Sequence, residues 1–381
     1  MRIHAILPSA RQQDARGDSM GEQIGSAHAA TVLQYPFVHR MAIALVEQPA
    51  GTLKTFVSSN DNGCALERYD RPLAEVPSLA RLADSRRSRV VDDMALSFAG
   101  SESTHTRWLR EQHFRSSLTV PVFFGGQLQA FFFFDSRQVA AFDPAAVRSL
   151  ELIAALTARI CTLQLKAMRS MSGLVGMVSN LARARDLETG QHLTRMAQYA
   201  RLMARALADR HGLSDEWIEY LYLFAPLQDI GKVGIPDEVL FKPGPLDARE
   251  WALMRTHVAI GVALVDQLGV DMGWEDSLAF ALMRNVVAFH HERGDGSGYP
   301  LGLDMRRIPL EGRIVAIADV YDALSNRRCY KRAWSEAEAV AELRREVAAG
   351  RLDGECVEAL VEARTERLAI QAACADDAPV P

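Results

Sequence analysis

The sequence has few cysteines, no excess of positive charge and no long hydrophobic run. The cysteines form no CxxC pair and no zinc-finger spacing, so we expect reduced thiols in a cytoplasmic protein; they are Cys64, Cys161, Cys329, Cys356 and Cys374. A formal net charge of −5 excludes the basic surface that holds a nucleic-acid polymer. No apolar run reaches the about 18 residues of a membrane span, and the N-terminal stretch MRIHAILPSARQQDARGDSM mixes apolar residues with proline and charges. We therefore expect neither a transmembrane helix nor an export signal.

The composition is that of a folded globular chain. Hydrophobic residues make up 49% and charged residues 24% of the 381 residues. These values exclude wholesale disorder, a collagen-like repeat and a disulfide scaffold. At roughly 150 residues per domain, the length predicts two to three domains.

The N-terminal third has the pattern of a sheet with helical cover. Residues 1–25 are small and polar and predict a loosely ordered arm, and residues 26–142 predict a domain. Within it, SLTVPVFF and QLQAFFFF are joined by Gly125-Gly126, which is the signal of a β-hairpin. Runs this apolar indicate strands covered on both faces. An α/β or α+β domain follows from this pattern.

Residues 143–184 predict one long helix. Asp143-Pro144 supplies an N-cap and a first-turn proline. Apolar or small residues then recur as a heptad seam, which is typical of a coiled coil; they are Ile153, Leu156, Ile160, Leu163, Ala167, Ser170, Leu174, Met177 and Leu181. We expect a parallel homodimer through this helix. The alternative is a connecting helix that packs only on its own domains.

Residues 185–370 are rich in helical pattern and carry histidines among carboxylates, before a tail at 371–381 that we expect to fray. Glu188 and His192 are four residues apart and share a helix face. Mixed imidazole and carboxylate donors suit divalent transition metals. The other members of this set are Asp229 after Gln228, His257, the pair His290-His291, and Asp319.

The order of motifs in this region resembles the HD-GYP family. The resemblance runs from about residue 180 to 345 through RDLETGQHLTRM, QDIGKVGIPDEVLFKPGPL, MRTH, HHERGDGSGYPLGL and GRIVAIADVYDALSNRRCYKRAW. It implies an all-α HD-superfamily domain that hydrolyses cyclic di-GMP to linear pGpG, GMP or both, with two or three iron or manganese ions. The metal ligands that it implies are Glu188, His192, Asp229, His257, His290, His291 and Asp319, with Asp229 and Lys232 catalytic. The substrate-binding residues that it implies are Lys232, Gly298, Tyr299, Pro300, Asp322, Arg328 and Lys331.

Residues 26–142 resemble a GAF sensory domain through FRSSLTVPVFFGGQLQAFFFFDS and FDPAAVRSLELIAAL. This resemblance implies an α/β domain that binds an unknown small effector and regulates the C-terminal domain, with signalling proteins as further partners. The expected architecture is therefore a GAF-like domain, a coiled-coil helix and an HD-type helical domain.

One departure from the HD-GYP pattern bears on activity. Gln228 stands where the family has the histidine of its first motif, and an amide oxygen is a poorer ligand than imidazole for first-row metals. Pro226 could also kink the segment that presents this residue. Three hypotheses stay open: an active phosphodiesterase with a weakened metal centre, a cyclic-di-GMP receptor or interaction protein without turnover, and a hydrolase of nucleoside triphosphates or (p)ppGpp.

Overall fold

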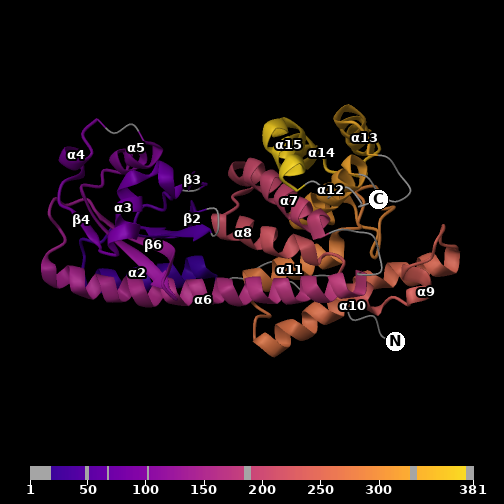
Figure 1. The fold of residues 1–381 in the computed structure, drawn as a ribbon, viewed down its shortest axis with the longest axis horizontal. Helices are drawn as coiled ribbons and strands as arrows, with labels where there is room; N and C mark the ends of the chain where they lie inside the picture. Colours follow the sequence, from indigo (N-terminus) through magenta and orange to yellow (C-terminus); the bar gives the residue numbers. More distant parts are fainter. Residues whose placement is uncertain are drawn as a thin grey trace. The chain divides into compact units, whose positions relative to one another are not determined.

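The computed structural model describes residues 19–47, 51–66, 68–100, 103–183, 190–326 and 333–374. The chain divides into two compact units at residues 167 and 168. One unit is Asp18–Ala167, and the other contains Met168–Pro381. The boundary falls inside a single helix, α6 (Pro144–Arg183), which is 40 residues long (Figure 1).

The N-terminal unit is built on a six-stranded antiparallel sheet in the order β3-β2-β1-β6-β5-β4. The expected hairpin is present as β5 and β6, and both turn glycines, Gly125 and Gly126, have positive φ, which glycine adopts without strain. The strands are β1 (Arg40–Glu47), β2 (Thr52–Asn60), β3 (Asp70–Pro72), β4 (Arg89–Val91), β5 (Ser116–Phe124) and β6 (Gln127–Ser136). The helices that precede α6 are α2 (Met20–Gln34), η1 (Leu73–Glu75), α3 (Pro77–Ser85), α4 (Met94–Ser97) and α5 (Thr104–Glu111).

Both faces of the sheet are covered, as the apolar strands predict. Leu79 and Leu82 of α3 pack with Phe131 and Phe133 on one face. On the other side, α2 and the first half of α6 lie against the sheet (Figure 1). The α/β interpretation of this domain is confirmed.

Part of the segment expected as a loosely ordered arm is helical. Helix α2 begins at Met20, because Ser19 and Glu22 form a capping box in which each side chain accepts a hydrogen bond from the other residue's backbone N–H. Residues 20–25 are therefore helical rather than loosely ordered. The capping box marks where the helix begins. The helix also needs a surface against which to bury Ile24, and strands β1 and β2 of the sheet provide it.

Helix α6 has two distinct apolar stripes. The Asp143 carboxylate caps it by accepting hydrogen bonds from the N–H groups of Ala145 and Ala146. The stripe with Leu150 and Ala154 is fully buried against its own domain. The expected seam lies elsewhere, and three of its large members are exposed: Leu156 by 57%, Ile160 by 53% and Leu163 by 46%, whereas Ile153 is half-buried.

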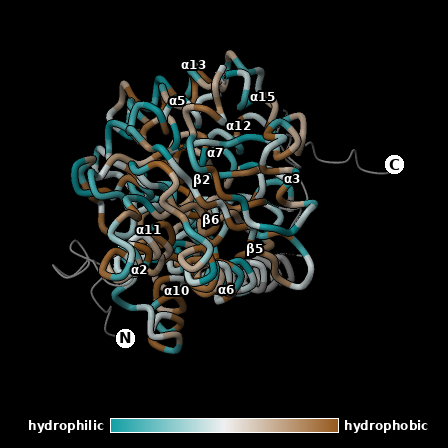
Figure 2. Tube along the Cα trace, turned by 90° about the vertical axis from the view of Figure 1, so that its left-hand side faces the viewer, coloured by the Kyte–Doolittle hydropathy of each residue, from teal (hydrophilic) through white to brown (hydrophobic). Residues whose placement is uncertain are grey.

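The C-terminal unit is helical, and an isolated β-bridge pairs Asp295 with Asp304. Figure 2 colours much of α11 as hydrophobic, and this helix is almost wholly buried. The longer helices are α7 (Gly190–His211), α8 (Asp215–Phe224), α10 (Ala248–Met272), α11 (Leu278–Phe289), α12 (Leu310–Ser325), α13 (Glu336–Ala348), α14 (Gly354–Glu362) and α15 (Arg364–Ala373). The short ones are η2 (Ala225–Leu227), η3 (Ile230–Gly234), α9 (Asp237–Leu240) and η4 (Met305–Arg307).

Helix α10 is the one described helix that is long and apolar enough, by length and composition alone, to cross a membrane. The core helix of a folded domain meets the same criterion. Here His257, Val258 and Val262 of this helix are buried in the domain. Only 33% of its apolar window is buried, and Trp251 and Val270 of the same helix are exposed.

Candidate metal centre

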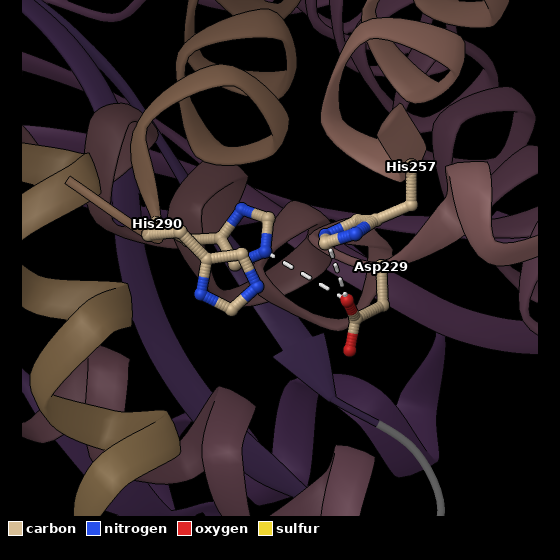
Figure 3. Close-up of side chains that lie close together, drawn as sticks. Asp229, His257 and His290 are labelled. Carbon is tan, nitrogen blue, oxygen red and sulfur yellow. Dashed lines mark ion pairs between the residues drawn. The ribbon is translucent and has the colours of Figure 1, made fainter. Parts of the chain in front are cut away.

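Four side chains from three separate segments converge in the C-terminal unit. Asp229 stands between η2 and η3, His257 lies on α10, and His290 and His291 follow the last residue of α11. One donor atom from each lies within 4.8 Å of all the others. Figure 3 shows Asp229 facing the rings of His257 and His290. Four of the seven expected metal ligands thus form one cluster.

A glycine allows this convergence. A Cβ atom at Gly231 would lie only 1.9 Å from the carbonyl oxygen of His257 and 2.5 Å from the backbone nitrogen of Gly261. The backbone of η3 therefore rests directly on the backbone of α10, an approach that a residue with a side chain would prevent. Asp229, one residue before η3, is brought beside His257 as a result.

Hydrogen bonds hold the two buried imidazoles in one tautomer. The Nδ1 atom of His257 lies 2.8 Å from the carbonyl oxygen of Met254, and Nδ1 of His290 lies 3.1 Å from that of Val287. A carbonyl oxygen only accepts, so Nδ1 carries the proton and donates. Burial lowers the pKa of His257 to about 4, which leaves this ring neutral near pH 7. Its Nε2 atom then presents a lone pair.

These lone pairs point at a carboxylate oxygen. Asp229 Oδ1 lies 3.4 Å from Nε2 of His257 and 3.7 Å from Nε2 of His290. Both Nε2 atoms are buried and have no hydrogen-bond partner. Three electron-rich atoms facing one another repel unless a cation or proton lies between them. The donor set therefore fits a divalent transition metal ion.

His291 completes the cluster through its ring contacts. Its ring centroid lies 4.0 Å from that of His290 and 5.1 Å from that of His257. Burial, followed by the neighbouring His290, lowers the pKa of His291 far below its ordinary value. A neutral imidazole at His291 is thus available to the cluster.

Two more expected ligands form a second pair. Nε2 of His192 lies 3.9 Å from Oδ1 of Asp319. On its other side, Nδ1 of His192 lies 2.7 Å from Oδ2 of Asp322, and Oδ1 of the same carboxylate accepts a hydrogen bond of 2.6 Å from Nε of Arg195. Asp322 fixes the direction of the His192 ring, as carboxylates commonly do for metal-binding histidines. Glu188 lies outside the described residues.

Asp322 is placed differently from the expectation of a substrate contact. Its side chain is buried, and its carboxylate accepts hydrogen bonds from His192, Arg195 and Asn326. Burial alone would raise the pKa of Asp322, but the hydrogen bonds from His192 and Arg195 outweigh it and the pKa is lowered. Because the buried Asp322 carboxylate already accepts these hydrogen bonds, it is better placed to orient His192 than to contact a ligand.

Gln228 is fully buried, and neither atom of its amide group has a hydrogen-bond partner. Burying an unsatisfied amide costs about 1–3 kcal/mol. The η2 turn that contains Pro226 continues from α8 and leads into Gln228, whose backbone N–H donates to the carbonyl of Ala225. The Gln228 side chain is thus held inside the domain, one residue before Asp229 in the chain.

The expected signature loop lies against the histidines. The ring of Tyr299 stacks on that of His291, with centroids 4.6 Å apart. The Glu292 carboxylate holds the loop by accepting hydrogen bonds from the N–H groups of Leu301 and Leu303. A Cβ at Gly298 would lie 2.2 Å from the backbone nitrogen of Arg293, so this position needs glycine. Pro300 follows Tyr299 in the same loop.

Positive side chains flank this region. Nζ of Lys232 lies 2.9 Å from Oδ2 of Asp229. The guanidinium of Arg255 lies 5.0 Å from the centre of the Tyr299 ring, and the sequence reasoning missed this residue. The only signal in the sequence is that Arg255 lies two residues before the expected ligand His257. Arg328 and Lys331, with the neighbouring Arg327 and Arg332, lie outside the described residues.

Comparison with known protein families agrees with this geometry. Residues 178–356 match the HD domain and residues 20–160 match the GAF domain. One relative is the 3′3′-cGAMP-specific phosphodiesterase 2 of Vibrio cholerae, 40% identical over 53% of this chain and 37% of that protein. Another, from the same organism, is a probable cyclic di-GMP phosphodiesterase, 43% identical over 45% of this chain and 40% of that protein.

A third relative is the cyclic di-GMP phosphodiesterase response regulator RpfG of Xanthomonas campestris, 45% identical over 50% of this chain and 48% of that protein. The matched segments cover less than half of the length of each of these relatives. The chain therefore carries a segment that matches the GAF domain, followed by a segment that matches the HD domain.

Proposed function

We propose that this protein is a metal-dependent phosphodiesterase that opens cyclic di-GMP to linear pGpG, and on to GMP if the second bond is also cut. The observation that carries the proposal is the set of three facing acceptors, Asp229 Oδ1 and the Nε2 atoms of His257 and His290. In the reaction, water adds to phosphorus, one P–O ester bond breaks, and the departing 3′ oxygen takes up a proton. The relatives' substrates support a cyclic dinucleotide.

We assign the metal ligands to two groups. Asp229, His257, His290 and His291 would hold one ion, and His192 and Asp319, together with Glu188, would hold another. Nitrogen and oxygen donors in this mixture favour iron or manganese, in two or three ions. Divalent ions held in this way polarise a phosphoryl oxygen and supply the nucleophile at neutral pH.

The protein's own residues orient the substrate. Lys232, whose Nζ lies 2.9 Å from Oδ2 of Asp229, places a positive charge beside the cluster where it can meet a phosphate. Tyr299, backed by the Gly298 and Pro300 backbone and flanked by Arg255, offers an aromatic face for a base. Arg328 and Lys331 are proposed as further phosphate contacts. Asp322 acts as a positioning residue for His192.

The test is hydrolysis by the full chain purified under anaerobic conditions. Metal content is measured first, and turnover of cyclic di-GMP and of 3′3′-cGAMP is then followed in manganese and in ferrous iron. We expect metal in the purified protein and faster turnover of cyclic di-GMP. Binding of cyclic di-GMP without any turnover in the metal-loaded protein would replace the enzyme by a receptor, which the unsatisfied amide of Gln228 favours as the second candidate.

We also propose that the chain works in the cytoplasm. Four cysteines lie within the described residues, and all four are free thiols. Thiols persist in the reducing cytoplasm. Regulation by the GAF domain and binding of signalling proteins are part of this proposal.

We further propose a parallel homodimer through the exposed stripe of α6. Substituting glutamate for Ile160 and Leu163 should give monomers, because a coiled-coil seam would then bury four charges. The measurement is sedimentation at micromolar concentration. The matched control is Ala155→Glu, which places one charge at an exposed position of α6 away from the seam. A monomeric wild type, or double variants that remain dimeric, would contradict the coiled coil.

A further inference from the structure

Arg195 of α7 is a buried arginine that meets a carboxylate beside the candidate metal ligands. It is 2% exposed and lies three residues after His192 on the same helix. Residues three apart share a helix face. Arg195 and His192 therefore both face Asp322 of α12, whose carboxylate accepts hydrogen bonds from both side chains.

The guanidinium of Arg195 fixes the plane of the Asp322 carboxylate. Its Nε atom donates to Oδ1 at 2.6 Å, and its Nη2 atom donates to Oδ2 at 3.1 Å. Two hydrogen bonds from a planar guanidinium set both the position and the rotation of a carboxylate. Oδ2 is the oxygen that lies 2.7 Å from Nδ1 of His192. Arg195 thus places the acceptor that orients the His192 ring.

Arg195 also supplies the positive charge that Asp322 needs. The side chains of Asp322 and Arg195 are 3% and 2% exposed, and a carboxylate buried to this degree is costly without a cation. A neutral imidazole gives a hydrogen bond but no compensating charge. With Arg195 in place, His192 can remain a neutral ligand whose Nε2 lies 3.9 Å from Oδ1 of Asp319.

A further nitrogen of Arg195 reaches the end of the C-terminal helix. Nη1 donates to the carbonyl oxygen of Cys374 at 2.8 Å, across 179 residues of chain. Cys374 ends α15, and its N–H donates to the carbonyl of Ile370. Helix α15 packs on α7 (Figure 1). It lies beyond residue 356, where the segment that matches the HD domain ends.

Helix α15 is held in place by a second arginine. Arg367 is 1% exposed, and its Nη2 donates to Oε1 of Glu336 on α13 at 2.6 Å. Its guanidinium lies 5.3 Å from the centre of the ring of Tyr321, the residue before Asp322. The Cys374 carbonyl therefore belongs to a helix that is fixed against α12 and α13 by other contacts, so it gives Arg195 a defined acceptor.

We propose that Arg195 is a positioning residue for the metal site that contains His192, and that the Cys374 carbonyl at the end of α15 holds Arg195 in the required orientation. The inference rests on the proposed function, in which His192 is a metal ligand. It extends the support of the metal centre to a segment outside the part of the chain that matches the HD domain.

The first experiment is a double-mutant cycle in Mn²⁺ binding, measured by calorimetry on the metal-free full chain. Arg195→Lys keeps the charge but loses the paired hydrogen bonds, and His192→Gln removes the proposed ligand. We expect Arg195→Lys to weaken the binding of one Mn²⁺ ion by about 10–100-fold. The double variant should bind no more weakly than His192→Gln alone, because Arg195 acts through His192.

Arg284→Lys is the matched control for the loss of a buried arginine. Arg284 of α11 is 5% exposed, and its Nε donates to Oδ1 of Asp266 on α10 at 2.7 Å. This substitution removes a similar ion pair from the same unit. It should lower the thermal midpoint of the metal-free protein and leave unchanged the Mn²⁺ ion that His192→Gln affects.

The second experiment tests the carbonyl of Cys374 with two substitutions at that residue. Proline has no N–H to donate to Ile370 and disfavours a helical conformation at Ala373, so Cys374→Pro should displace the carbonyl. We expect the same Mn²⁺ ion to bind about tenfold more weakly, which is the scale of a lost hydrogen bond to a charged group. Cys374→Ala keeps both backbone groups and should bind Mn²⁺ as the wild type does.

Four results would overturn the inference. Arg195→Lys would bind Mn²⁺ as tightly as the wild type, or its effect would add in full to that of His192→Gln, which would indicate a role in folding alone. Cys374→Pro and Cys374→Ala would bind equally, a comparison that decides even if Arg195→Lys fails to fold. A wild type that binds no Mn²⁺ would remove the proposed function together with this inference, whereas the other three results leave the proposed function intact.

Discussion

Replacing Asp229 with asparagine abolishes metal binding and phosphodiester hydrolysis together. Asp229 is the one carboxylate in the four-residue cluster, and its Oδ1 faces the Nε2 atoms of both His257 and His290. Asparagine removes the negative charge with almost no change of shape. We expect hydrolysis to fall by roughly a thousandfold or more, which corresponds to about 4 kcal/mol in activation free energy.

The readouts are metal per chain after purification, hydrolysis of cyclic di-GMP, and the thermal midpoint of the metal-free protein. An asparagine N–H can donate to a histidine Nε2, so the metal-free variant should unfold no earlier than the metal-free wild type. The matched control is Asp276→Asn, an exposed carboxylate between α10 and α11, which should leave all three readouts unchanged. Full metal content in the Asp229 variant would contradict the assignment of the cluster.

Replacing Gln228 with histidine raises metal occupancy and turnover. The present side chain is fully buried with an unsatisfied amide, and an imidazole at this position would add a nitrogen donor next to Asp229 in the chain. Loss of a residue that supports a metal ligand typically costs about 10–100-fold in metal affinity or activity, so restoring an imidazole should recover a similar factor. The measurements are metal titration and the rate with cyclic di-GMP under ferrous iron or manganese.

Gln228→Leu is the matched control for this substitution. Leucine has a similar size and no polar atoms, so it should stabilise the metal-free fold by removing the unsatisfied amide without raising metal affinity. If Gln228→His changes neither metal content nor rate, residue 228 does not border the metal centre. The η2 turn around Pro226 would then be the structural reason, because it sets the direction of the residue that follows.

Local signals in the sequence were sufficient for much of the fold. Gly125-Gly126 between two apolar runs predicted the β5–β6 hairpin, and Asp143-Pro144 predicted the start of α6. Ser19 with Glu22 carried an equally local signal, a capping box, that the sequence reasoning did not use. Such features are readable because the interacting groups lie within a few residues of one another.

The types and spacing of the candidate ligands were also present in the sequence. His257, His290, His291 and Asp229 were all expected in one metal centre, and the fold brings these four together. The heptad seam of α6 was readable too, whereas its exposure was not. That exposure depends on which stripe of the helix the sheet buries.

Only the tertiary structure decided how these residues are supported. Asp322 looked like a substrate contact from its motif, yet it accepts hydrogen bonds from His192 and Arg195 on another helix. Gly231 brings the segment with Asp229 onto α10. These contacts join segments tens of residues apart, and their geometry follows from backbone packing and burial, which no local pattern of residues specifies.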